Sequence, residues 1–131
     1  TINKIVFAAD FNKLKNFRHY FTEINQLANI FDAQIHFLHI SSVENVYLPE
    51  DSDVFASITQ IIKNNNKHKL WNLHGKDLSN KVMEYVEINQ VRLVTMVRHQ
   101  LHFPENLFHK NYRDDISLKS TVPVLILKEL E

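Results

Sequence analysis

Short apolar runs alternate along the chain with longer amphipathic stretches. Each apolar run has the length of a β-strand, and an almost fully apolar run predicts a strand buried on both faces of a sheet. The pattern predicts five strands, at residues 5–9, 35–40, 70–73, 92–97 and 124–127.

The amphipathic stretches between these runs predict helices, because their apolar residues recur at spacings of three and four. The first helix is expected over about residues 12–33. A second follows the candidate N-cap residues 51–53, and a third follows a turn at Gly75, with Asp77 as its cap. A short fourth helix is expected over about residues 107–119.

This succession of strands and helices is typical of an α/β domain. Strands that alternate with helices form an open parallel sheet, with helices on both of its faces. We find no linker and no internal repeat, and therefore predict one domain over residues 1–131. Trp71 and the phenylalanines of the first helix are interpreted as core residues.

Composition excludes several classes of function. Lys and Arg number 15 and Asp and Glu number 15, so no basic field is present to hold nucleic acid. The chain contains no cysteine, which excludes disulfides, thiolate catalysis and cysteine-based zinc sites. No apolar run approaches the ~20 residues of a membrane span, and no signal peptide is visible, so we expect a cytoplasmic protein.

Glycine is unusually scarce. A chain of this length would carry about 9 glycines at average usage, whereas this one has only Gly75. The Gly-rich loops that cradle phosphates, and the GxSxG elbow of hydrolases, are therefore absent.

Both ends of the chain carry recognisable motifs. Residues 4–11, KIVFAADF, and residues 121–127, TVPVLIL, resemble the first and last strands of the universal stress protein family. The similarity covers the whole chain and implies a stress-response function and a sheet order of 3-2-1-4-5. Residues 107–110 particularly resemble divergent members, often tandem two-domain proteins of the Bacteroidetes type, and the start at Thr1 rather than Met fits such a protein.

The chain departs from this family in the nucleotide motif. ATP-binding members carry Gly-x-x-Gly, nine residues, and then Gly-Ser/Thr/Asn after the fourth strand. The three glycine positions fall on Val97, Gln100 and Lys110, and only Asn111 fits its position. Glycines let backbone N–H groups approach phosphates closely, and these glycines are missing here. We therefore predict no cofactor, with binding of ATP or AMP as the alternative.

Two strand ends match positions that contact the nucleotide in the family. Asp10, which ends the first strand, matches an aspartate at the adenine and ribose region; the alternative is that it caps the following helix. Ile40 ends the second strand, where the family packs against the base; the alternative is an ordinary strand end.

The segment after the fourth strand is locally basic. Arg98, Lys110 and Asn111 would take the place of the glycine amides at a phosphate. The alternative is a loop anchored by its aromatic residues, with solvated charges.

The eight histidines give no strong metal motif. His36 and His39 are three apart on a predicted strand, so they face opposite sides of the sheet and cannot share an ion. His99, His102 and His109 could hold zinc, but loop histidines are usually solvated, and we predict no metal. No catalytic constellation is found, so we expect a protein that is not an enzyme.

The last predicted strand suggests an interface. It has no following helix, and the family often pairs this strand in a dimer or between tandem domains. We therefore predict a homodimer or tandem-domain contact through Val122, Val124 and Ile126, and the binding of an unidentified protein partner. The alternative is a protected monomer edge.

Overall fold

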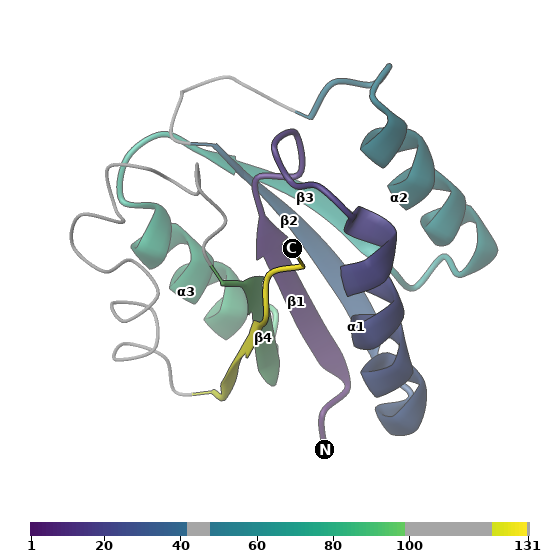
Figure 1. The fold of residues 1–131 in the computed structure, drawn as a ribbon. Helices are drawn as coiled ribbons and strands as arrows, with labels where there is room; N and C mark the ends of the chain where they lie inside the picture. Colours follow the sequence, from purple (N-terminus) through teal and green to yellow (C-terminus); the bar gives the residue numbers. More distant parts are fainter. Residues whose placement is uncertain (42–47, 99–121, 131) are drawn as a thin grey trace.

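The chain folds into a five-stranded parallel sheet with helices on both faces (Figure 1). The structure is a computed structural model, and it describes residues 1–41, 48–98 and 122–130. The elements in chain order are β1 (Lys4–Ala9), α1 (Phe17–Phe31), β2 (Gln34–Ser41), α2 (Asp53–Asn64), β3 (Lys69–His74), α3 (Leu78–Ile88), β4 (Leu93–Val97) and β5 (Val124–Leu127). The predicted α/β class and all five predicted strands are confirmed. The predicted helix over residues 107–119 lies outside the described residues.

The strands are ordered β3-β2-β1-β4-β5, as the family resemblance implied. The central strand β1 pairs with β2 and β4, and β3 and β5 are the outer strands. The chain therefore builds one half of the sheet outward from β1 and then crosses to the other side of β1.

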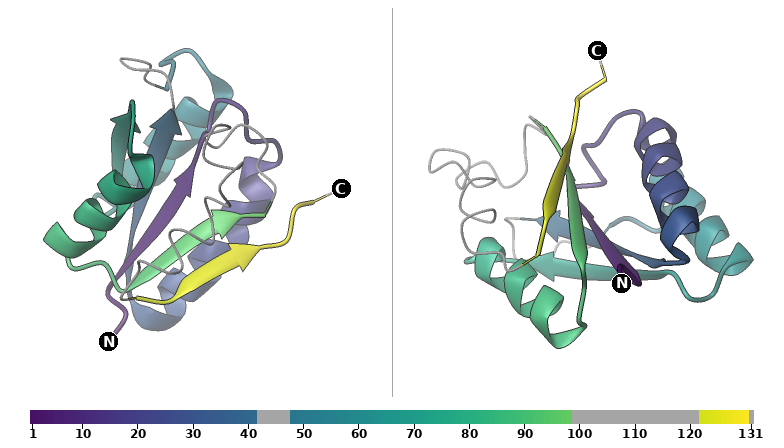
Figure 2. Two further views of the ribbon diagram at one scale, coloured as in Figure 1. Left: turned by 90° about the vertical axis from the view of Figure 1, so that its left-hand side faces the viewer. Right: turned by 90° about the horizontal axis from the view of Figure 1, so that it is seen from below.

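The two faces of the sheet have different cores. We call the face covered by α1 and α2 the aromatic face, and the face covered by α3 the aliphatic face (Figure 2). The buried rings of the aromatic face are those of Phe7, Phe11, Phe17, Tyr20 and Phe37. The buried side chains of the aliphatic face are those of Val6, Ala8, Leu38, Ile40, Leu78, Val82, Val86, Val91, Val94 and Met96.

Helix α1 begins later than its hydrophobic periodicity predicted. The backbone first makes a turn in which the Asp10 carbonyl accepts hydrogen bonds from Lys13 N at 3.1 Å and Leu14 N at 3.0 Å. Asn16 then adopts a left-handed φ of 62°, which helical residues do not have. The helix therefore starts at Phe17, and Leu14 packs against the aromatic core from the turn.

Of the N-caps predicted for the other two helices, one is confirmed and one is not. Ser52 caps α2 as predicted, since its side chain accepts a hydrogen bond from Phe55 N at 3.2 Å. Asp77 precedes α3 but makes no side-chain cap hydrogen bond, because its backbone has a left-handed φ of 56°. Gly75 forms the predicted turn, with a φ of 92° that favours glycine.

The interpretation of Trp71 as a core residue is wrong. Its side chain is 57% exposed, because it lies on the outer strand β3. Phe17 is buried as predicted, whereas Phe31, at the end of α1, is 38% exposed. Among the described residues, no helix has the length and apolar character needed to cross a membrane.

Candidate functional site

The carboxyl ends of β1 and β4 form the point at which the order of the strands reverses. Ligands of open parallel sheets bind outside the carboxyl ends of the strands at such a point. The ladder between β1 and β4 runs from Ile5 and Leu93 to Phe7 and Thr95, although both strands continue for two further residues. The two strands thus cease to pair before their carboxyl ends, while β4 stays paired with β5 to its last residue, Val97.

Asp10 lies directly after β1 and is 6% exposed. Its Oδ1 accepts a hydrogen bond from Asn12 N at 3.1 Å, and its carbonyl accepts from the two following turn amides. The alternative that Asp10 caps helix α1 is therefore wrong, because its carboxylate caps the turn that precedes the helix. Its predicted contact with a nucleotide remains a prediction.

The buried residue His39, which we weighed in the sequence only as a metal ligand, supports this turn. His39 Nδ1 accepts a hydrogen bond from Phe11 N at 3.1 Å. The two rings stack with their centroids 6.2 Å apart. Burial lowers the pKa of His39 to about 4, so the ring is neutral and carries its proton on Nε2. Among the described residues, that Nε2 has no hydrogen-bond partner. The signal in the sequence was the position of His39 near the end of the second apolar run, and the structure places it opposite Ala9 of β1.

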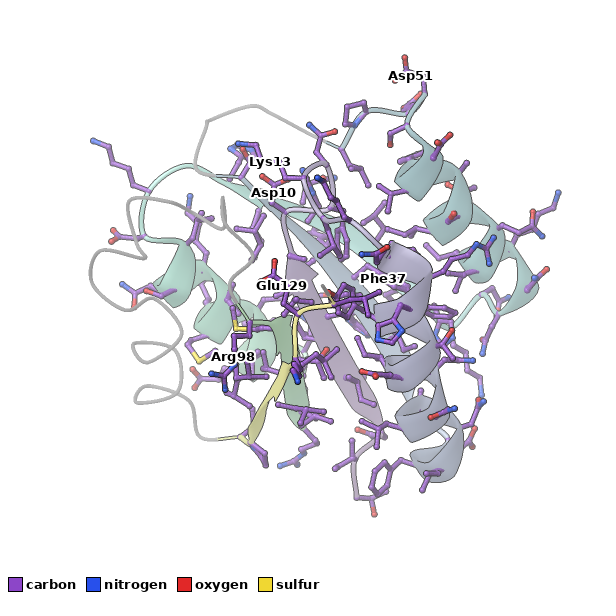
Figure 3. The ribbon with its side chains drawn as sticks, in the orientation of Figure 1. Asp10, Lys13, Phe37, Asp51, Arg98 and Glu129 are labelled. Atoms are coloured by element: carbon purple, nitrogen blue, oxygen red, sulfur yellow. The ribbon has the colours of Figure 1, made fainter. Side chains whose placement is uncertain are left out.

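Arg98 follows β4, and its side chain is exposed. Its backbone N–H extends the ladder by donating to the Leu127 carbonyl at 2.8 Å. Figure 3 shows Asp10 and Lys13 in the turn after β1, and Arg98 well separated from both. The structure therefore does not bring the predicted Asp10 and Arg98 side chains together.

Val97, on which the family resemblance places the first glycine of the motif, is a strand residue in this chain. Val97 is 5% exposed, lies opposite Leu127 in the ladder, and has a φ outside the left-handed region. Lys110 and Asn111 lie outside the described residues.

Ile40 is fully buried within the aliphatic face. It lies opposite Leu73 of β3, and the following residue, Ser41, accepts a hydrogen bond from Gly75 N at 3.1 Å through its carbonyl. The predicted packing of a base against Ile40 remains a prediction.

The strand histidines face opposite sides of the sheet, as predicted. His36 bonds to Tyr85 of α3 on the aliphatic face, whereas His39 stacks on Phe11 of the aromatic face. His99, His102 and His109 lie outside the described residues, and the part of the chain that is described contains no group of three metal-binding side chains.

The predicted interface residues lie on or beside the outer strand β5. Val122, Val124 and Ile126 are partly buried and pack against the aliphatic core. Leu125 points to the other face and is 36% exposed, which the prediction missed. Their role in an interface remains a prediction.

Comparison with known proteins supports the fold at low sequence identity. No family profile matches the chain, and no curated protein matches its sequence. A universal stress protein solved in complex with cAMP has a TM-score of 0.64 at 12% identity, over 95% of each chain. The universal stress protein from Archaeoglobus fulgidus in complex with dAMP has a TM-score of 0.61 at 15% identity, over 98% of this chain and 100% of that one. Universal stress protein UspA from Lactobacillus plantarum has a TM-score of 0.62 at 10% identity, over 96% of this chain and 97% of that one. The chain has the fold of universal stress proteins.

Proposed function

We propose that this chain is a divergent member of the universal stress protein family that acts in the stress response without catalysis. It works in the cytoplasm through pairing of its last strand and through binding of a partner protein. The observation that carries the proposal is the position of β5 as an outer strand of a family-like sheet. The exposed row of backbone groups on an outer strand is a template for pairing with another chain.

The register of β5 supports pairing through two of the predicted residues. Val94 N donates to the Pro123 carbonyl and Arg98 N donates to the Leu127 carbonyl, so Pro123 and Leu127 turn toward β4. Backbone groups alternate in direction along a strand, so the N–H and C=O groups of Val124 and Ile126 turn toward the outer edge. A second copy would pair with those groups.

The position of Val97 supports the absence of a glycine phosphate cradle. A regular, buried strand residue occupies the first glycine position and presents a β-branched side chain there. A backbone loop that closes on phosphates needs glycine-like freedom at such positions. The proposed function therefore does not depend on ATP hydrolysis.

A matched pair of variants at Val124 tests the pairing. Val124→Pro removes the edge-facing N–H and is compatible with an outer strand, whereas Val124→Ala shortens the side chain and keeps the N–H. We expect sedimentation velocity to show dimers for the natural chain and for Val124→Ala, and monomers for Val124→Pro. Circular dichroism checks that both variants fold. A monomeric natural chain, or a dimer that survives in Val124→Pro, contradicts the proposed interface.

The alternative function is binding of an adenine nucleotide with a modified phosphate loop and at most slow ATPase activity. It is favoured by the position of Asp10 at the carboxyl end of β1 and by the cAMP and dAMP bound to two proteins of the same fold. Asp10 would hold the adenosine end, and Arg98, Lys110 and Asn111 would hold the phosphates.

Isothermal titration with ATP and AMP, with and without Mg²⁺, tests this alternative. Asp10→Asn keeps the acceptor for Asn12 N and removes the charge, and Arg98→Gln removes one phosphate contact. We expect each variant to weaken a micromolar complex by roughly tenfold, the loss of one charge-assisted hydrogen bond. Absence of heat up to millimolar nucleotide would reject nucleotide binding and leave the pairing proposal standing.

A further inference from the structure

A groove separates α3 from the outer strand β3 on the aliphatic face, away from the carboxyl ends of β1 and β4. Its volume is about 570 Å³, and its walls come from both elements. Ligand pockets of proteins commonly have volumes of roughly 300–1,000 Å³. The groove is therefore large enough for a small organic molecule.

Four of the side chains that line the groove are apolar or aromatic, and two of these are strongly exposed. Trp71 of β3 is 57% exposed and Ile88 of α3 is 71% exposed, while Leu73 and Tyr85 are partly buried between them. Aromatic rings stack favourably on an exposed indole, and such a contact would remove both exposed apolar side chains from water. This surface suits a flat, largely apolar ligand.

The Tyr85 side of the groove is held in place by partly buried hydrogen bonds beneath it. His36 Nε2 lies 3.0 Å from Gln34 Oε1, which can only accept, so the histidine carries its proton on Nε2. His36 Nδ1 therefore accepts from the Tyr85 hydroxyl at 2.6 Å. Burial raises the pKa of Tyr85 to about 12, so its hydroxyl stays protonated and the ring stays in place.

The groove also has an excess of positive charge. Lys69 and Lys81 line it, and in the described part of the chain neither has a carboxylate within 4.0 Å. Lys81 Nζ donates to the His74 carbonyl at 2.5 Å, which holds this ammonium group at one end of the groove. Burial, with the charges of Lys4 and Lys69, lowers the pKa of His36 to about 4, which is consistent with a positive potential behind the wall. Glu84 is the acidic residue of the lining.

We propose that this groove binds a small aromatic anion, a flat ring system that carries one carboxylate or sulfonate group. The ring would stack on Trp71 between β3 and Ile88, and the anionic group would meet Lys69 or Lys81. The proposal is independent of the proposed function, because the groove shares no residue with the turn after β1 or with β5.

The single tryptophan of the chain makes occupancy directly measurable. The probe is 8-anilinonaphthalene-1-sulfonate, an aromatic anion that accepts excitation energy from a nearby indole. We expect titration of the natural chain to give saturable energy transfer from Trp71 to the bound probe. A neutral naphthalene of the same ring size should compete at least tenfold more weakly, because it lacks the charge.

Variants of exposed residues separate this site from nonspecific probe binding. The double variant Lys69→Gln/Lys81→Gln should weaken probe binding by roughly tenfold or more. The matched control Lys63→Gln/Lys67→Gln, in the last turn of α2 and in the connection that follows it, should not. Trp71→Ala should abolish the fluorescence enhancement of the probe itself. Thermal unfolding checks that the variants fold.

Two results would overturn the proposal. One is equal affinity of the probe for Lys69→Gln/Lys81→Gln and its control, which would show that the lysines do not hold the anion. The other is unchanged enhancement of probe fluorescence with Trp71→Ala, which would show that the probe binds elsewhere.

Discussion

The two faces of the sheet are built from different kinds of side chain, although the same strands contribute to both. On the aromatic face, Phe37 lies 6.0–6.2 Å from the rings of four other phenylalanines. On the aliphatic face, its neighbour Leu38 packs among Val, Leu, Ile and Met side chains. Ring packing is directional, whereas aliphatic packing is more tolerant of rearrangement. The turn that carries Asp10 is thus anchored through Phe11 to the core of packed rings.

The largest expected effect on stability comes from truncating two neighbouring residues of β2 that face opposite sides of the sheet. Phe37 and Leu38 are both fully buried on β2. We expect Phe37→Ala to reduce the free energy of unfolding by about 4 kcal/mol and Leu38→Ala by about 3 kcal/mol, measured by urea denaturation. Phe37→Leu should cost only about 1–2 kcal/mol, the loss of ring contacts without a large cavity. A larger loss for Leu38→Ala than for Phe37→Ala would contradict the difference between the faces.

A second comparison concerns two of the buried histidines, His36 and His39, which face opposite sides of the sheet. Burial is the main cause that lowers the pKa values of His36 and His39 from 6.5 to about 4, so protonation favours the unfolded chain. Their contribution to stability is complete above pH 6.5 and is lost as the pH falls toward 4, by about 1.4 kcal/mol per pH unit for each ring.

Denaturation at a series of pH values tests this loss. His39→Gln removes one titrating ring and keeps an acceptor for Phe11 N, and His36→Gln does the same on the other face for the Tyr85 hydroxyl. Each variant should reduce the slope of stability against pH by about one proton, and the double variant by about two. A slope that is the same in all four proteins would show that these rings do not control acid stability.

The smallest expected effect comes from removing one hydroxyl on each face. Tyr20 on the aromatic face accepts a hydrogen bond from Leu130 N at 2.7 Å, which ties the residues after β5 to α1. Tyr20→Phe should cost about 1 kcal/mol, because the exposed Leu130 N–H can turn to water. Tyr85→Phe should cost about 2 kcal/mol, because it leaves the buried His36 Nδ1 without its donor. Thermal unfolding measures both, and equal costs would argue against a buried acceptor at His36.

The strands and the fold class could be predicted because each strand is a short apolar run between polar segments. Residues 5–9 show this most clearly, since all five are buried at 0–1% exposure. The strand order could not be derived from periodicity, which does not record which strands are neighbours; it came from the resemblance at the two ends. The start of α1 was missed because the apolar spacing continues to Leu14 while the left-handed Asn16 interrupts the helix.

The candidate site was less accessible to sequence reasoning than the fold. The position of Asp10 followed from the end of an apolar run, but its bond to Asn12 N depends on the geometry of the turn. The role of His39 depends on Phe11, which is 28 residues away in sequence and adjacent only after β1 and β2 pair. Trp71 was assigned to the core because hydrophobicity alone does not distinguish an outer strand from an inner one.

The central position of β1 has a consequence for the order in which the chain is assembled during synthesis. One edge of β1 pairs with β2 within the first 41 residues, but its other edge waits for β4, which begins at Leu93. Until then the growing chain presents an apolar strand with an open edge, which is a template for aggregation. The arrival of β4, with Thr95 Oγ1 donating to the Val6 carbonyl at 2.7 Å, closes that edge. Chains cut before residue 93 are thus expected to form aggregates instead of a smaller version of this domain.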